Sequence, residues 1–206
     1  MTEAVIHMTQ FRFSPPGSQS PYIRGGGIYL RLPQMRDFDA WAAVRDESRR
    51  FLERWEPLWP ADDLTRAAFR RRINWYEEDV ARDASYPFFL FREGDDALMG
   101  GLTLGPVRRG VVQACTLGYW MGERFARQGY MSKAVAAAAY FVFNTLGLRR
   151  IEASCLPINE PSIGLLEKVG FVREGYARQY LCIAGVWEDH FLYALLKDDF
   201  LRRYST

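Results

Sequence analysis

Residues 117–133 read Leu117-Gly-Tyr-Trp-Met-Gly-Glu-Arg-Phe-Ala-Arg-Gln-Gly-Tyr-Met-Ser-Lys133, the pattern of a strand that leads through a short basic loop into a helix. The first amides of a helix have no partners within it, and they lie at the positive end of its dipole. A phosphate fits there, because Gly129 lets the backbone approach it closely and Arg127 adds positive charge. The stretch therefore predicts a phosphate-binding turn, and an ordinary strand-to-helix turn is the alternative.

The same loop argues against two common nucleotide-binding motifs. It lacks the Gly-Lys-Ser/Thr ending of a P-loop. Gly122 and Gly129 do not have the Gly-x-Gly-x-x-Gly spacing of a dinucleotide fingerprint. Neither of these nucleotide sites is therefore expected here.

A second informative stretch runs from Ile151 to Phe171 and reads as a strand, a turn and a short helix. Asn159 and Ser162 lie three residues apart at the start of that helix, which Gly170 ends. Asparagine and serine side chains cap helices by accepting hydrogen bonds from backbone amides. When this stretch is taken alone, capping by Asn159 is the simpler interpretation.

Hydrophobic periodicity predicts the remaining elements in the order β-α-α-β-β-β-α-β-α-β-β, typical of a mixed α/β sheet flanked by helices. Asp37 is the expected cap of the first helix. Residues 1–27 contain many Pro, Gly and Ser residues and are expected to form a tail before a single domain over 28–206. The expected strands are 28–32, 86–92, 98–105, 112–121, 150–156, one from 171 and one at 187–196; the expected helices are 37–50, 64–82, 129–146 and 161–168.

Composition narrows the possible functions. The chain has 206 residues, of which 49% are apolar and 25% charged, as in an ordinary globular domain. Its net charge of +2 is too small for bulk attraction to nucleic acid. We expect a cytoplasmic protein with no membrane partner, because no apolar run is long enough for a span and no secretory signal is visible.

Cysteine and histidine are scarce, which argues against metal and triad chemistry. The cysteines Cys115, Cys155 and Cys182 have neither metal-ligand nor disulfide-framework spacing. The histidines His7 and His190 are too few for a multi-histidine metal site. We therefore expect no metal ion and a reducing compartment.

Taken together, the two stretches resemble the GNAT acetyltransferase superfamily over roughly residues 28–196. The loop Ala126-Arg-Gln-Gly-Tyr-Met131 is similar to its pyrophosphate loop, Arg/Gln-x-x-Gly-x-Gly/Ala, with Ala126 and Met131 as departures. The run from Asn159 to Phe171 is similar to its motif Asn-x-x-Ser/Ala followed by Glu-Lys-x-Gly-Phe. The resemblance implies a mixed, mostly antiparallel sheet that splays at a cleft for acetyl-CoA.

Three further segments are similar to the RimJ/RimL branch of this superfamily. They are Trp55-Glu-Pro57, Gly129-Tyr-Met-Ser132 and Gly185-Val-Trp-Glu-Asp-His190. The branch is known for enzymes that acetylate the N-terminal amines of ribosomal proteins. The last segment is closer to the RimJ type, which acts on the N-terminal alanine of ribosomal protein S5. The resemblance therefore implies direct acetyl transfer from acetyl-CoA to an N-terminal α-amine.

The resemblance also implies roles for single residues. Asn159 would hydrogen-bond the pantetheine arm of the cofactor. Leu166 stands where the superfamily often has a general-acid tyrosine, and within the RimJ/RimL branch Ser162 looks like the residue that takes this role. Ser162 would protonate the departing sulfur or hold a water that does. The residues whose backbone would bind pantetheine and polarise the acetyl carbonyl are Leu117, Gly118, Tyr119, Trp120 and Met121. The residues whose amides would hold the pyrophosphate are Arg127, Gln128, Gly129, Tyr130, Met131 and Ser132.

The general base remains open. A free α-amine has a pKa of about 7.7–8.0, so a carboxylate acting through water suffices. Glu56 and Glu123 are the candidates, and a solvated surface charge is the alternative for each. Asp189 and His190 are weaker candidates. The residues expected to line the acceptor groove are Trp55, Glu56, Trp59 and Tyr180.

Two other functions are compatible with the sequence. The same fold acting on a small primary amine is the first, since a fold does not fix its substrate. The second is a non-enzymatic CoA-binding factor in ribosome assembly that touches ribosomal RNA weakly. The contact with RNA would come from a basic cluster, for which a solvated helix face is the simpler interpretation. Both a monomer and a homodimer fit the sequence. The basic cluster consists of Arg66, Arg70, Arg71 and Arg72.

Overall fold

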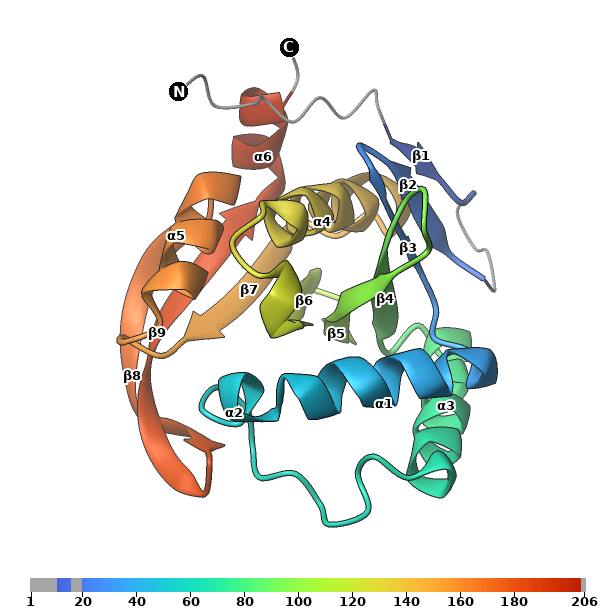
Figure 1. Cartoon of the computed structure of the whole chain (residues 1–206). Coiled ribbons are helices and arrows are strands. Elements are labelled where there is room, and N and C mark those ends of the chain that lie inside the picture. Colours follow the sequence, from blue (N-terminus) through green and yellow to red (C-terminus); the bar gives the residue numbers. More distant parts are fainter. Residues whose placement is uncertain (1–10, 16–19, 205–206) are drawn as a thin grey trace.

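The computed structural model describes residues 11–15 and 20–204, and in these residues nine strands form one sheet (Figure 1). The strand order is β1-β2-β3-β4-β5-β6-β7-β9-β8, and every neighbouring pair is antiparallel except the parallel pair of β6 and β7. The expected mixed, mostly antiparallel sheet is therefore confirmed. The strands are β1 (Arg12–Phe13), β2 (Tyr22–Gly25), β3 (Ile28–Arg31), β4 (Tyr86–Arg92), β5 (Leu98–Arg108), β6 (Ala114–Met121), β7 (Arg150–Cys155), β8 (Val172–Ile183) and β9 (Val186–Leu196).

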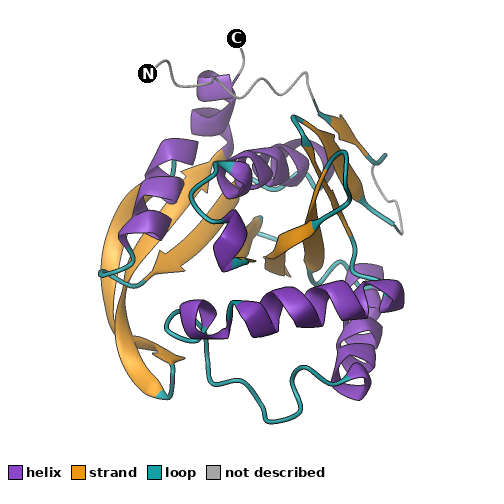
Figure 2. Ribbon diagram, in the orientation of Figure 1, coloured by secondary structure: helices purple, strands orange, loops and turns teal. Residues whose placement is uncertain are grey.

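Helices lie on both sides of this sheet (Figures 1 and 2). In the view of Figure 1, α4 lies above the central strands and α1 and α2 lie below them, while α5 lies beside the C-terminal strands. Aromatic and aliphatic side chains from both layers fill the space between helices and sheet, with Trp41, Phe69 and Phe141 almost fully buried. The helices are α1 (Phe38–Glu47), α2 (Arg49–Leu52), α3 (Arg66–Ala81), α4 (Tyr130–Tyr140), α5 (Glu160–Val169) and α6 (Lys197–Tyr204).

The sheet begins earlier than the sequence predicts. β2 pairs with β3 over four residues, and β1 pairs with β2. The expectation that regular structure starts at Ile28 is therefore wrong for residues 12–13 and 22–25. Backbone pairing to an edge strand stabilises these short segments, whose Gly- and Pro-rich surroundings conceal them in the sequence. The remaining positions of the expected tail at 1–10 and 16–19 lie outside the described residues.

Two details of the helices also differ from expectation. Asp37 precedes α1 but makes no side-chain cap; its carboxylate instead accepts bonds from Arg31, at 2.6 and 2.8 Å, and from the Gln34 amide. Asp37 thus pairs with β3 and closes a capping box with Gln34 at the 3₁₀ turn Met35–Asp37, in place of capping α1. The helix α6 was not expected, and it docks through the buried Phe200.

The predicted helix over 129–146 is real but not uniform. α4 covers Tyr130–Tyr140, and its alanine-rich sequence is buried on nearly every side. A wider π-helical turn follows at Phe141–Thr145, in which Phe141 and Phe143 enter the core. Small side chains let α4 approach the strands closely, which fixes the position of its N-terminal turn.

The sheet splays between β6 and β7. These parallel strands pair only over Ala114–Thr116 and Arg150–Glu152. Beyond Thr116, β6 stays paired with β5 through Met121, so its other edge is left open. The predicted splay is therefore confirmed, and it places free backbone groups along one wall of a gap.

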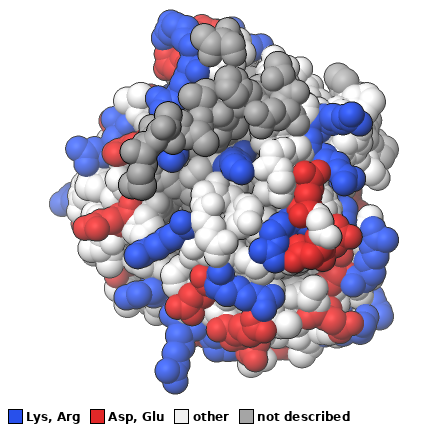
Figure 3. Space-filling model, turned by 45° about the horizontal axis from the view of Figure 1, so that its top comes forward, with Lys and Arg blue, Asp and Glu red and all other residues white. Residues whose placement is uncertain are grey.

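No helix of the described part of the chain is long and apolar enough to cross a membrane. On the face seen in Figure 3, lysine and arginine side chains lie next to aspartate and glutamate side chains. Basic and acidic residues number 27 and 25 in the whole chain, so this mixing agrees with its near-neutral charge.

Candidate active site

A cleft of about 1160 Å³ opens where β6 and β7 diverge. Its walls come from β6 and the loop after it, the first turn of α4, the end of β7, α5, and the segment 51–57 that follows α1. The fold thus brings together segments more than a hundred residues apart in the sequence. The predicted cofactor residues that line this cleft are Leu117, Gly118, Tyr119, Trp120, Met121, Arg127, Gly129, Tyr130, Met131, Ser132, Asn159 and Ser162.

The loop between β6 and α4 has the geometry of an anion-binding turn. Arg127 and Gly129 both adopt left-handed backbone conformations, with φ of 61° and 80°. Gly129 is the N-cap of α4, and no side chain caps this helix. The first-turn amides of Tyr130, Met131 and Ser132 are therefore left for a ligand at the positive end of the helix dipole.

Three glycines leave space along the cleft. A Cβ atom added at Gly118, Gly129 or Gly164 would meet nothing within 4 Å, and all three residues line the cleft. Gly118 lies on β6 and Gly164 on α5, so the two face the cleft from different walls. Their missing side chains form a cradle that a long, thin ligand can fill.

Asn159 and Ser162 lie together at the start of α5. The Asn159 side-chain oxygen accepts a hydrogen bond from the Ser162 amide at 3.2 Å, which confirms the capping interpretation. The cap leaves the amide hydrogens of the Asn159 side chain free to serve the cleft that this residue lines. Capping and ligand binding are therefore compatible roles for Asn159.

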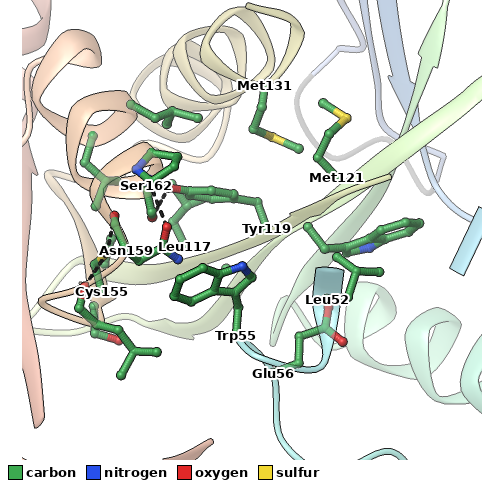
Figure 4. Close-up of a pocket in the computed structure, with 18 of the residues that line it drawn as sticks. Leu52, Trp55, Glu56, Leu117, Tyr119, Met121, Met131, Cys155, Asn159 and Ser162 are labelled. Atoms are coloured by element: carbon green, nitrogen blue, oxygen red, sulfur yellow. Dashed lines mark hydrogen bonds between the residues drawn. The ribbon is translucent and has the colours of Figure 1, made fainter. Parts of the chain in front are cut away.

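Ser162 contacts a buried phenol. Its Oγ lies 2.6 Å from the hydroxyl oxygen of Tyr119. Burial raises the pKa of the Tyr119 phenol far above its usual value, although the hydrogen bond with Ser162 lowers it in part. The Cys155 thiol also lines the cleft, but its sulfur lies 3.4 Å from the Leu156 carbonyl oxygen and 3.7 Å from that of Asn159. Burial raises the pKa of this thiol. Figure 4 shows the Tyr119 side chain pointing toward Ser162.

On the opposite side of the cleft, an ion pair between Arg45 and Glu56 supports the wall. Arg45, which is 7% exposed, donates to both oxygens of Glu56, at 3.1 and 2.7 Å. The indole nitrogen of Trp59 donates to the same carboxylate at 2.7 Å, and its ring lies 4.0 Å from the Arg45 guanidinium. Glu56 therefore enters the cleft with its charge already balanced, while Trp55 projects into the middle of the cleft (Figure 4).

Several predicted site residues lie elsewhere. Among the described residues lining the cleft, Glu123, Gln128, Trp59 and Tyr180 are not found. Glu123 is exposed after β6, and Gln128 turns its side chain back to the Arg124 carbonyl. Trp59 packs beneath the cleft against Arg45, and Tyr180 lines a separate small cavity on the C-terminal strands. Position along the sequence does not determine which side chains face the cleft.

Of the two weaker candidates for the general base, His190 lines the cleft and Asp189 does not. His190 lines the cleft, but it is buried and its Nδ1 lies 2.9 Å from the Glu188 carbonyl oxygen. Asp189 accepts bonds from Tyr176 and from the Gln179 amide, where it holds a bulge in β8. Within residues 11–15 and 20–204, no group of three or more His, Cys, Asp and Glu side chains is placed to hold a metal ion.

Sequence reasoning missed three cleft features. Arg45 lies one helical turn after Trp41, on the buried face of α1, and this spacing was a usable signal. Gly164 lies inside a helix, where glycine is costly unless something approaches closely. Tyr119 alternates with Leu117 and Met121 along β6, but nothing in the sequence connects its hydroxyl to Ser162.

The comparisons with known proteins agree with this geometry. The family model described as an acetyltransferase (GNAT) domain matches residues 28–172. A crystal structure of ribosomal-protein-S5-alanine acetyltransferase from Vibrio fischeri superimposes with a TM-score of 0.81 at 27% identity, covering 87% of this chain and 98% of that one. The fold and the cleft are thus those of an acetyltransferase.

Two curated relatives match nearly end to end. "Probable N-acetyltransferase YjcK" of Bacillus subtilis is 36% identical over 177 residues, which are 86% of this chain and 98% of that protein. "[Ribosomal protein uS5]-alanine N-acetyltransferase" of Escherichia coli is 34% identical over 184 residues, 88% of this chain and 95% of that protein. The chain belongs to the GNAT acetyltransferase family. It is an N-acetyltransferase that uses acetyl-CoA.

The cleft fits this cofactor. The uncapped first turn of α4 suits a pyrophosphate, and the open edge of β6 offers backbone groups to the amides of pantetheine. Gly118 and Gly164 leave the clearance that the pantetheine arm requires. Mycobacterium smegmatis RimJ, with a TM-score of 0.81 at 27% identity over 94% of this chain and 91% of that one, was solved in complex with CoA-disulfide.

Replacing Gly164 by alanine is expected to stabilise the fold and at the same time to weaken the binding of acetyl-CoA. A helix interior favours alanine over glycine by roughly 0.5–1 kcal/mol, so the free energy of unfolding should rise. The added methyl group enters the cradle, so the KM for acetyl-CoA should rise roughly tenfold. Thermal unfolding and initial-rate kinetics measure the two effects. Gly164→Val should raise KM further, and a KM unchanged in both variants would mean that the cofactor does not pass this helix.

Proposed function

We propose that this enzyme acetylates the N-terminal α-amine of a ribosomal protein, with the alanine of protein S5 as acceptor. One observation carries the proposal. The segment around Trp55-Glu-Pro57 meets the tip of the β8–β9 hairpin at the cleft, where the Ala184 amide donates to the Glu56 carbonyl at 2.9 Å. Trp55-Glu-Pro57 and the hairpin segment Gly185–His190 are two of the three segments similar to the RimJ/RimL branch, and the hairpin segment is the one closer to the RimJ type. The Escherichia coli relative named for this reaction supports the same acceptor.

The residues of the cleft have distinct tasks in this proposal. Acetyl-CoA supplies the acetyl group as a reactive thioester. The free edge of β6 at Leu117–Met121 places backbone amides beside the cleft, where they polarise a carbonyl oxygen. Asn159 orients the pantetheine arm, and Ser162 Oγ gives its proton to the departing sulfur.

Removal of the amine proton needs little help. Roughly a tenth or more of an α-amine is neutral at pH 7, so water carries the proton away without a strong base. Arg45 and Trp59 hold the Glu56 carboxylate at the cleft, where its oxygens can accept a hydrogen bond from an ammonium group. We therefore propose that Glu56 orients the incoming amine, directly or through one water. Glu123, which is exposed and outside the cleft lining, is not retained.

The acceptor proposal is tested by thiol release from acetyl-CoA on two sets of acceptors. One is a peptide with the N-terminal sequence of S5, which begins with alanine, and the other is a panel of small primary amines. We expect turnover on the peptide and none on the same peptide with its α-amine blocked. Turnover on small amines alone would overturn the ribosomal acceptor and leave the acetyltransferase assignment intact.

The structure weakens the case for a ribosome-binding surface on α3. Three of its four clustered arginines are engaged with aspartates, which cancels much of the charge that would attract RNA. Acetylation of a ribosomal protein in the cytoplasm requires no such surface. The pairs are Arg66 with Asp39 at 3.6 Å, Arg71 with Asp62 at 2.6 Å and Arg72 with Asp63 at 2.5 Å.

A further inference from the structure

The Tyr119 hydroxyl has no task in the mechanism described above, yet it lies in the cleft. Tyr119 faces Ser162 across the start of α5, with 2.6 Å between the two hydroxyl oxygens. This distance is at the short end for a hydrogen bond between hydroxyl groups. The two residues come from different walls, β6 and α5, so the contact exists only because the sheet splays at this point (Figure 4).

The chemistry of the two groups decides which one donates. A phenol is more acidic than an aliphatic hydroxyl and is therefore the better donor. Ser162 has one hydroxyl proton to donate. If Tyr119 donates to Ser162 Oγ, the Ser162 proton is directed away from the phenol and is left for a ligand in the cleft that both residues line.

We propose that Tyr119 is a positioning residue for acetyl transfer: its phenol donates to Ser162 Oγ and so commits the single Ser162 proton to the departing sulfur of CoA. This inference rests on the proposed role of Ser162 as the acid. It assigns the task of orienting that acid to the hydroxyl of a tyrosine on β6, on the opposite wall from Leu166.

The step balances without any further reactant. The amine nitrogen bonds to the acetyl carbon, the carbon–sulfur bond breaks, and its electron pair stays on sulfur. Ser162 Oγ gives its proton to that sulfur, and the proton lost by the amine returns to Ser162 through water. Tyr119 keeps its own proton throughout, because burial raises the pKa of its phenol. Its hydrogen bond stabilises the partial negative charge that forms on Ser162 Oγ during the transfer.

The first test needs no acceptor. The pKa of the CoA thiol is measured in the binary complex by its ultraviolet thiolate absorbance, with the desulfo-CoA complex as the blank for the protein's own thiols. An oriented Ser162 donor stabilises the bound thiolate, so Tyr119→Phe should raise that pKa by about one unit. Calorimetry should show CoA affinity within about twofold of the wild type. An unchanged thiol pKa would overturn the proposal.

The second test is a double-mutant cycle on turnover. Tyr119→Phe should lower kcat roughly tenfold in the wild type and should have no further effect when Ser162 is alanine. An equal loss in both backgrounds would overturn the relay through Ser162. Full turnover in the Ser162→Ala variant would show that Ser162 is not the acid. Impaired turnover in Ser162→Ala together with full turnover in Tyr119→Phe would exclude only the role of Tyr119. The cycle works with any amine that the enzyme acetylates, whether or not it is the natural acceptor.

Tyr193 provides the matched control. Its phenol is also buried and donates to Glu167 at 3.2 Å, but it lies on β9 outside the cleft lining. Tyr193→Phe removes one buried hydroxyl and one hydrogen bond, as Tyr119→Phe does. It should leave both the CoA thiol pKa and kcat unchanged, so an effect confined to Tyr119 distinguishes positioning from a general loss of packing.

Discussion

Replacing Ser162 by alanine is expected to lower kcat about 10²–10³-fold while leaving the affinity for acetyl-CoA nearly unchanged. The substitution removes the hydroxyl that faces Tyr119 in the cleft. Without it, the departing thiolate has no donor at this position, and the barrier to carbon–sulfur cleavage rises. The measurement is steady-state kinetics on the peptide acceptor, with calorimetric titration of CoA.

Folding should not confound this result. The cap of α5 uses the backbone amide of Ser162, not its side chain, so alanine keeps the bond to Asn159. Alanine also has the higher helix propensity, and the melting temperature should therefore stay the same or rise slightly. Ser85→Ala is the matched control, since its hydroxyl is buried and bonded to Asp79 and the residue is not part of the cleft lining. A kcat of Ser162→Ala within twofold of the wild type would exclude this serine as the acid.

Replacing Arg45 by methionine is expected to lower the free energy of unfolding by about 3–5 kcal/mol. Methionine retains much of the apolar packing, but Glu56 loses both of its guanidinium bonds and Asp63 loses a neighbouring positive charge at 3.9 Å. Removing one partner of a buried pair leaves the other charge poorly solvated. The melting temperature should fall by roughly 6–20 °C for a chain of this size, as measured by calorimetry.

Two comparisons make the Arg45 prediction specific. Arg49→Met changes a 42% exposed arginine on the neighbouring helix, whose ion pairs with Asp46 and Glu53 should contribute no more than about 1 kcal/mol. Combining Arg45→Met with Glu56→Gln should recover part of the lost stability, because the uncompensated charge is then absent. If Arg45→Met is no less stable than Arg49→Met, the Arg45–Glu56 ion pair does not stabilise the wall of the cleft that contains Glu56.

Much of the fold was accessible from local sequence patterns. The strand at 86–92 was predicted with its observed bounds, because a run of apolar and aromatic residues between turn signals has few other solutions. α1, α3 and α5 agree within a few residues, because α1 and α3 carry apolar residues at helical spacing and α5 has a proline in its first turn and Gly170 at its end. β1, β2 and α6 were missed because pairing or docking with distant residues stabilises them, and periodicity within so short a segment is weak.

The candidate site was predicted only in part, and the division has a physical basis. The phosphate turn and the Asn159 cap depend on backbone conformations set by nearby residues, so Gly129 and Asn159 announced them locally. Glu123 and Tyr180 lie outside the cleft lining, because a residue near the cleft in sequence can turn its side chain to solvent or to another cavity. Neither the backbone nor the residue type reveals that direction.

By itself the sequence determined that an uncapped helix start follows a strand, that a serine stands three residues after a capping asparagine, and that the chain resembles acetyltransferases. The tertiary structure decided which side chains meet. The pairs Tyr119–Ser162 and Arg45–Glu56 join residues on different elements, 43 and 11 positions apart. Their contact depends on how far β6 and β7 diverge and on how α1 packs beneath the cleft. Such distances are set by the packing of the whole core, which no local pattern contains.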